Sequence, residues 1–266
     1  MTRAARRRAA APASAASVLL VLLCGCSPPA GSAPAGSAPA SASTATLSVF
    51  AAASLTDSFD ALGRQFEEAH PGVTVVLNAA GSAELAQQIL SGAPADILAT
   101  ASDATMATVA DAGLLAAPAQ VFARNSLEIA VPPGNPGQVA GLADFSKAGL
   151  LLALCAPEVP CGASAAAALT RAGVSPDPDT LEQGVTSVLT KVRLGEVDAG
   201  IVYRTDVLAA GGAVVGVPIP DAQNATTDYP IAVLAGAQHP ALAEQFVALV
   251  RGSGQDALRE AGFAAP

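Results

Sequence analysis

Two serines of this sequence follow the same local pattern. An apolar run at 47–50 is typical of a strand, and small alanines separate it from Ser54, where a helical spacing of apolar residues begins. Ser82 likewise follows an apolar run, at 73–77, and precedes a second helical pattern. Because the start of a helix offers free backbone N–H groups and a partial positive charge, both serines are candidate ligands for an anion. The alternative is that they only cap their helices, Ser54 in a capping box with Asp57.

The second half of the chain repeats this combination of a strand followed by a helix start. Cys161 stands directly before a helical pattern at 163–172, and Gly184 precedes another one. Tyr203 ends a strand-like run, and its hydroxyl either meets a ligand or lies at the edge of the core. Helix starts are therefore expected to contribute to the same kind of site from both halves of the chain.

The elements that would position these residues alternate along the chain. Strand-like runs and helical patterns follow one another from residue 47 onward, which predicts an α/β fold with mostly parallel sheets. Short strands are expected at 121–123 and 127–131. The residues between them, 124–126, are expected to form a crossing from one part of the fold to the other.

The start of the chain is expected to be a leader followed by a tether. Arginines precede an apolar run at 18–23 that is too short to cross a bilayer. The motif Leu23-Cys24-Gly25-Cys26 resembles the lipobox of bacterial lipoproteins, which implies cleavage before Cys26 and a lipid on its sulfur. An ordinary signal peptide is the alternative. Residues 27–46 are small, uncharged residues and prolines, typical of a flexible tether.

Charge and cysteine usage limit the partners of the remaining chain. Without the four arginines of the leader, nine basic residues face 22 acidic ones, a net charge of −13 that argues against nucleic acid and anionic lipid. Cys155 and Cys161 are the cysteines outside the leader, and an oxidising compartment favours a disulfide between them over two free thiols. The cysteines and the two histidines lack the spacing of a zinc site.

Six short motifs together resemble the molybdate-binding proteins of ABC importers, in the right order and over nearly all of 47–266. They are Phe50-Ala51-Ala52-Ala53-Ser54-Leu55, Gly81-Ser82-Ala83-Glu84-Leu85-Ala86, Gly92-Ala93-Pro94-Ala95-Asp96-Ile97, Val159-Pro160-Cys161-Gly162, Gly200-Ile201-Val202-Tyr203 and Asp228-Tyr229-Pro230-Ile231. The resemblance implies a two-lobed periplasmic-binding-protein-like fold of type II, with two hinge crossings. One lobe would comprise 47–124 and 229–266, and the other 125–228.

The resemblance also implies the ligand and its contacts. The oxyanion would be held by serine hydroxyls, backbone N–H groups and a tyrosine hydroxyl, which carry over to Ser54, Ser82, Cys161, Val185 and Tyr203. The family usually has alanine where this chain has Cys161. The implied protein is a monomeric, lipid-anchored binding protein on the outer face of the cytoplasmic membrane. It would capture molybdate or tungstate without a cofactor and deliver it to an ABC permease.

Other functions remain as alternatives to be tested. Sulfate has the same charge and shape as molybdate, whereas a ferric chelate or an organic acid fits the motifs less well. Sugar binding is disfavoured because the chain has no tryptophan. An enzyme is disfavoured because the sequence has no Gly-x-Ser-x-Gly elbow, no Gly-x-Gly-x-x-Gly loop and no Walker loop.

Overall fold

The computed structural model describes residues 44–266, so the predicted leader, Cys26 and most of the tether lie outside the described residues. The strands are β1 (Ala45–Ala52), β2 (Val73–Ala80), β3 (Ile97–Ala99), β4 (Gln120–Val131), β5 (Leu152–Cys155), β6 (Thr180–Glu182), β7 (Ala199–Tyr203), β8 (Val215–Pro218) and β9 (Thr226–Val233). The helices are α1 (Thr56–Ala69), α2 (Ser82–Leu90), α3 (Asp103–Asp111), α4 (Pro160–Ala172), α5 (Val185–Leu194), α6 (Arg204–Ala210), α7 (Pro240–Arg251) and α8 (Gln255–Glu260). Short 3-10 turns occupy Ala53–Leu55, Leu142–Ser146 and Gly211–Ala213.

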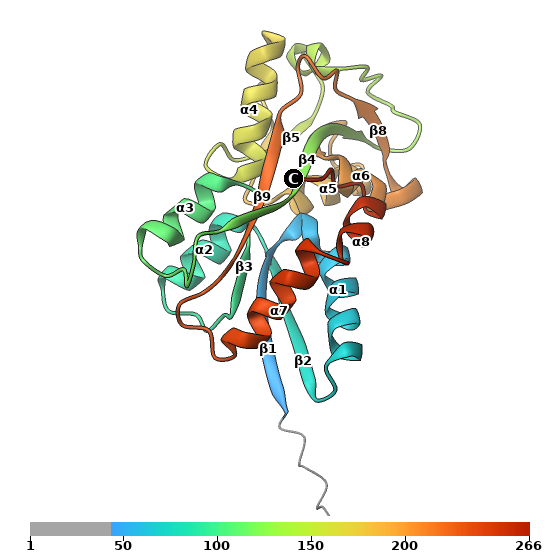
Figure 1. Cartoon of the computed structure of the whole chain (residues 1–266). Helices are drawn as coiled ribbons and strands as arrows, with labels where there is room; N and C mark the ends of the chain where they lie inside the picture. Colours follow the sequence, from blue (N-terminus) through green and yellow to red (C-terminus); the bar gives the residue numbers. More distant parts are fainter. Residues whose placement is uncertain (1–43) are drawn as a thin grey trace, which may run out of the picture. The chain divides into compact units, whose positions relative to one another are not determined.

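The strands form a mixed sheet in the order β2-β1-β3-β9-β4-β7-β5-β6, with β8 paired to β4. Strand β1 pairs in parallel with β2 and β3, and β5 pairs in parallel with β6 and β7. The two parallel groups are joined by β4 and β9, which run antiparallel to their partners. Figure 1 shows β4 and β9 side by side along the middle of the fold.

Strand β4 corrects one expectation from the sequence. The two short strands predicted at 121–123 and 127–131 are one continuous strand, and residues 124–126 lie inside it. Its partner changes from β9 to β7 between Ser126 and Leu127. A polar triplet interrupts the apolar pattern without interrupting the backbone ladder, because Arg124 and Asn125 pair in register with β9. The division into two lobes at these crossings stays a prediction.

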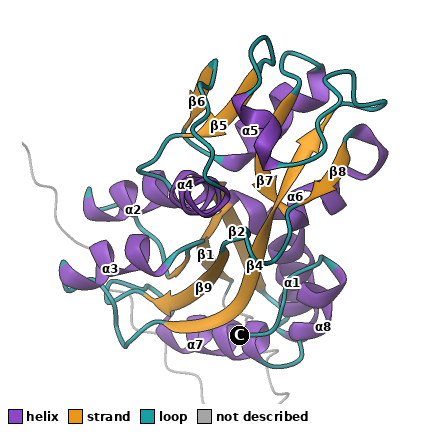
Figure 2. Ribbon diagram, turned by 90° about the horizontal axis from the view of Figure 1, so that it is seen from above, coloured by secondary structure: helices purple, strands orange, loops and turns teal. Residues whose placement is uncertain are grey.

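Strand β1 buries apolar side chains on both of its faces. Along β1, Leu47 and Val49 belong to one apolar cluster with Phe59 of α1, whereas Phe50 belongs to a second cluster with Leu85 of α2. Period-two alternation therefore sends apolar side chains to both faces, as is typical of a parallel sheet covered by helices. Helices α2 and α3 lie on one side of these strands, and α1, α7 and α8 on the other (Figures 1 and 2).

The helices of the second parallel group begin next to the strands that precede them. Helix α5 runs from Val185 to Leu194 and is terminated by Gly195, a residue with φ 68°, as predicted from the sequence. Helix α4 begins at Pro160, three residues before the predicted start, because proline at the first helical position continues the pattern upstream. Among residues 44–266, none of the helices combines the length and the apolar character that a membrane crossing requires.

Candidate functional site

The strand register brings Ser54 and Ser82 together. Ala52 of β1 and Ala80 of β2 are paired residues at the carboxyl ends of parallel neighbours. Each serine lies two residues beyond its paired alanine, at the point where the chain turns from strand to helix. Because parallel strands end at the same edge of a sheet, this arrangement places both hydroxyls at one edge, where ligands of α/β folds commonly bind.

The second parallel group presents a corresponding edge. Cys155 of β5 pairs with Glu182 of β6, and β7 ends at Tyr203. The chain enters α4 at Pro160 and α5 at Val185 shortly after the first two of these strand ends. Helix starts from both parallel groups therefore border a common space.

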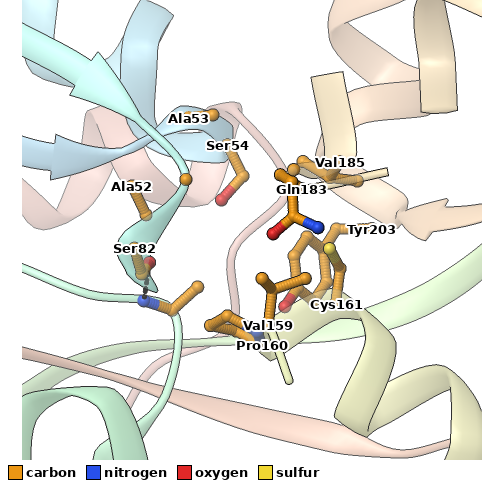
Figure 3. A pocket seen from close by; sticks show the side chains of 13 residues that line it. Ala52, Ala53, Ser54, Ser82, Val159, Pro160, Cys161, Gln183, Val185 and Tyr203 are labelled. Atoms are coloured by element: carbon orange, nitrogen blue, oxygen red, sulfur yellow. Dashed lines mark hydrogen bonds between the residues drawn. The ribbon is translucent and has the colours of Figure 1, made fainter. Parts of the chain in front are cut away.

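A small cavity lies between these strand ends. Its lining comprises Ala52, Ala53, Ser54, Gly81, Ser82, Ala101, Val159, Pro160, Cys161, Gln183, Gly184, Val185 and Tyr203. All five residues proposed from the sequence to hold the ligand are among them, although their contact with a ligand stays a prediction. Figure 3 shows the two serines on one side of the space and Cys161, Gln183 and Tyr203 on the other.

The size and composition of the cavity restrict its ligand. Its volume is about 20 Å³, close to the about 10–15 Å³ that one water needs and far below the about 300–1,000 Å³ of pockets for drug-sized ligands. None of the lining residues is Lys, Arg, His, Asp or Glu. The site therefore suits a small, compact ligand that is recognised by neutral donors.

Ser54 does not cap a helix, which corrects the capping-box prediction. It lies in the 3-10 turn Ala53–Leu55, and neither that turn nor α1 has a side-chain cap. Its Oγ lies 2.9 Å from Tyr229 Oη instead. The short turn between β1 and α1 shifts the helix start to Thr56, so Ser54 lies outside α1, and the residue lines the cavity.

Ser82 corrects a second capping prediction. The N-cap of α2 is Gly81, and Ser82 is the first residue inside the helix, where its side chain cannot cap. Ser82 is 4% exposed, and its Oγ accepts a hydrogen bond from Ala101 N at 3.1 Å, the dashed line in Figure 3. The hydroxyl oxygen thus binds the backbone beyond β3, and its hydrogen is free for another acceptor.

Tyr203 supplies a buried hydroxyl to the cavity. The residue is 1% exposed, and none of the described side chains meets hydrogen-bond geometry with its Oη. Burial, and then the Asp206 carboxylate, raise the pKa of Tyr203 well above its ordinary value, and the nearby hydroxyls of Ser164 and Tyr229 only partly offset this. The phenol is therefore protonated over the physiological range and can donate its hydrogen.

Cys161 and Val185 offer backbone donors. They occupy the first turns of α4 and α5, where N–H groups have no acceptor inside the helix. A disulfide joins Cys161 to Cys155 and ties the start of α4 to the end of β5. The backbone at Gly162 passes close to the backbone at Ala156, because a Cβ at Gly162 would lie 1.9 Å from the Ala156 carbonyl oxygen. Only glycine fits there.

Sequence reasoning missed Gln183 and the backbone contact that it makes. Gln183 lines the cavity, with its amide between Ser54 and Tyr203 in Figure 3. A Cβ at Gly81 would lie 2.7 Å from the Gln183 carbonyl oxygen, so the backbones at the ends of β2 and β6 nearly touch. The position of Gln183 two residues before Val185 was the available signal, but a sequence pattern does not give the direction of a loop side chain.

Comparisons with known proteins show the family of this chain. Residues 47–264 match the family model of bacterial extracellular solute-binding proteins. The chain belongs to this family. Among relatives of this solute-binding protein, the molybdate-binding protein ModA of Mycobacterium tuberculosis H37Rv is 42% identical over 254 residues, which cover 95% of this chain and 96% of that protein. The ModA of Escherichia coli K12 is 33% identical over 203 residues, covering 71% and 77%.

Solved structures show the same fold. The periplasmic molybdate-binding protein of Azotobacter vinelandii superposes with a TM-score of 0.69 at 19% identity, covering 83% of this chain and 99% of that one. The sulfate-binding protein SubI of M. tuberculosis superposes with a TM-score of 0.76 at 19% identity, covering 83% and 87%. At these identities the likeness shows the fold alone. The predicted α/β fold of the periplasmic-binding-protein kind and the resemblance to molybdate-binding proteins are thus confirmed.

Proposed function

We propose that this protein captures molybdate, and equally tungstate, in the cavity and delivers the ion to an ABC permease. The observation that carries the proposal is the lining: helix starts and three hydroxyl side chains converge on a small space without a charged side chain. The 42% identity to a ModA over almost the whole chain supports molybdate as the ion. We propose further that the protein binds its ligand without a reaction and without a cofactor, and its membership of a solute-binding family supports this.

The chemistry of the donor set matches a fully deprotonated oxyanion. Molybdate is a tetrahedral dianion with no hydrogen to offer, so it needs donors on all sides. Ser54, Ser82 and Tyr203 can supply O–H groups, and Cys161 and Val185 can supply N–H groups. A hydrogen bond to a charged partner contributes about 1.5–3 kcal/mol, so five to seven of them would support micromolar or tighter binding after ordering and desolvation costs.

Sulfate is the competing ligand. The sulfate-binding SubI and the molybdate-binding structure of A. vinelandii both share the fold, so the fold does not separate the two ions. Sulfate has the same charge and symmetry but is smaller, so the donor types do not separate the two ions. Selectivity depends on whether the donors can contact the smaller ion simultaneously.

Calorimetric titration of the purified protein with molybdate, tungstate, sulfate and phosphate tests the proposal. We expect one molybdate or tungstate per chain, with sulfate far weaker and phosphate weaker still. A Ser54→Ala variant serves as the site control and should weaken molybdate binding by about 10-fold to 150-fold. Equal affinity for sulfate would contradict the selectivity, and an unaltered Ser54→Ala variant would contradict the site.

Anchoring and assembly are further parts of the proposal. We propose that Cys26 carries a lipid that holds the protein at the outer face of the cytoplasmic membrane, and that the protein acts as a monomer. The lipobox-like motif around Cys26 supports the anchor. Labelling of cells with a radioactive fatty acid should mark the protein, and a Cys26→Ser substitution should abolish the label and release the protein from membranes.

A further inference from the structure

We propose that Tyr229 and Thr227 are positioning residues that hold the two site serines with their hydrogens directed toward the anion. The inference rests on the proposed function of the cavity. Both residues lie on one face of β9, two positions apart, and neither lines the cavity. Tyr229 is 0% exposed and Thr227 8% exposed. Each is connected to one serine by hydrogen bonds.

The connection to Ser54 runs through Tyr229. Asn125 Nδ2 donates to Thr205 Oγ1 at 2.8 Å and to Tyr229 Oη at 3.4 Å, and Tyr229 Oη lies 2.9 Å from Ser54 Oγ. The orientation of the Asn125 amide is fixed because its Oδ1 accepts a hydrogen bond from Ser126 N at 3.0 Å. The nitrogen of this amide therefore faces Tyr229, and an amide nitrogen can only donate.

This network decides which of the two hydroxyls donates to the other. Tyr229 Oη already accepts from Asn125, so its own hydrogen needs an acceptor in a fully buried environment. Ser54 Oγ is the hydroxyl within hydrogen-bond distance, whereas leaving the buried hydrogen unpaired would be costly. Tyr229 therefore donates to Ser54. The hydrogen of Ser54 is then left to point into the cavity that this residue lines.

The connection to Ser82 runs through Ala101. Thr227 Oγ1 donates to the Ala101 carbonyl oxygen at 2.8 Å, and Ala101 N donates to Ser82 Oγ at 3.1 Å. Thr227 thus fixes the backbone residue that occupies the acceptor side of Ser82. The result is the same as for Ser54: the serine oxygen accepts from the protein, and its hydrogen remains for the ligand.

Strand β9 therefore determines that both serine hydroxyls act as donors toward the cavity. A hydroxyl whose oxygen is occupied by a protein donor is biased to donate, which favours an ion without a hydrogen over a protonated one. Strand β9 also pairs with β4 up to the residue where β4 changes partner, so the positioning residues belong to the segment that joins the two parallel groups.

Double-mutant cycles on molybdate affinity test this inference. If Tyr229 acts through Ser54, Tyr229→Phe should weaken binding by about fivefold, and the same change should add little in a Ser54→Ala background. Thr227→Val should behave likewise with Ser82→Ala. Thr226→Val is the matched control, because this exposed threonine lies on the opposite face of the same strand and should leave affinity unchanged.

A selectivity measurement separates positioning from a general structural effect. Tyr229→Phe frees the Ser54 oxygen to accept, so the affinity ratio of molybdate to hydrogen phosphate should fall by more than in the Thr226→Val control. Losses that add in both double mutants, or an unchanged ratio, would overturn the inference even if Ser54→Ala weakens binding. If Ser54→Ala itself binds normally, the proposed site fails instead. Should Tyr229→Phe fail to fold, the Thr227 and Ser82 cycle decides the question alone.

Discussion

Replacing Tyr203 with phenylalanine should change stability and affinity in opposite directions. In the described part of the chain, the Tyr203 hydroxyl is buried without a hydrogen-bond partner. An unpaired buried polar group costs about 1–3 kcal/mol, so its removal should stabilise the unliganded protein by about 1 kcal/mol, at the lower end because neighbouring hydroxyls lie close. The liganded protein would lose a charge-assisted hydrogen bond of about 1.5–3 kcal/mol, which corresponds to about 10-fold to 150-fold weaker molybdate binding.

The other tyrosine of the chain provides the matched control. Tyr229→Phe removes the same atom but breaks hydrogen bonds to Ser54 and Asn125, so it should lower the stability of the unliganded protein. Urea unfolding without ligand and calorimetric titration with molybdate would be measured for both variants. If Tyr203→Phe is destabilised as much as Tyr229→Phe, or if it binds molybdate normally, the assignment of a free donor at Tyr203 is wrong.

Three further changes probe the surroundings of the site. In Gly81→Ala, the backbone φ of −58° accepts alanine, but the new Cβ would lie 2.7 Å from the Gln183 carbonyl oxygen. Molybdate affinity should therefore fall by about tenfold in a calorimetric titration. Gly236→Ala is the control and should bind normally, because the space around Gly236 is open. Burial raises the pKa of Asp206 to about 7, so this group stabilises the fold most below its unfolded pKa near 4, and that stability is lost as the pH rises toward 7. In Asp206→Asn, the free energy of unfolding measured in urea should depend less on pH between about 4 and 7. An unchanged pH dependence would contradict the assignment. Cys155→Ser should lower stability by about 2 kcal/mol in urea, and no loss would show that the disulfide does not form in the purified protein.

The edge that holds the two serines could be predicted from the sequence, and the physical reason is local. Strand-like runs that end in small residues before a helix predict a turn at the carboxyl end of a strand, and parallel pairing then brings such turns together. Ala52 pairs with Ala80, and this pairing brings the turns that contain Ser54 and Ser82 together. The start of α5 at Val185 was predictable for the same reason, because capping signals are local.

The direction of each hydroxyl could not be predicted. Both serines satisfy the local rule for an N-cap, yet Ser54 contacts Tyr229, which lies 175 residues away, and Ser82 contacts the backbone of Ala101 beyond β3. Such partners depend on tertiary contacts that a local pattern does not contain. The continuity of β4 was missed for a related reason: Asn125 is polar because it serves a buried network, and a search for loops treats it as a break.

The net negative charge of the chain and the absence of cationic side chains in the lining are compatible if the site is a set of oriented neutral donors. Nine basic and 22 acidic residues in the described part of the chain oppose the approach of a dianion, and screening by salt weakens that opposition beyond about 10 Å. Inside the cavity, short-range hydrogen bonds and helix starts act at contact distance, where the net charge matters less. A lysine or arginine in the site would add attraction for every anion alike. Oriented hydroxyls instead distinguish anions by whether they carry a hydrogen, which is the property that separates molybdate from phosphate at neutral pH.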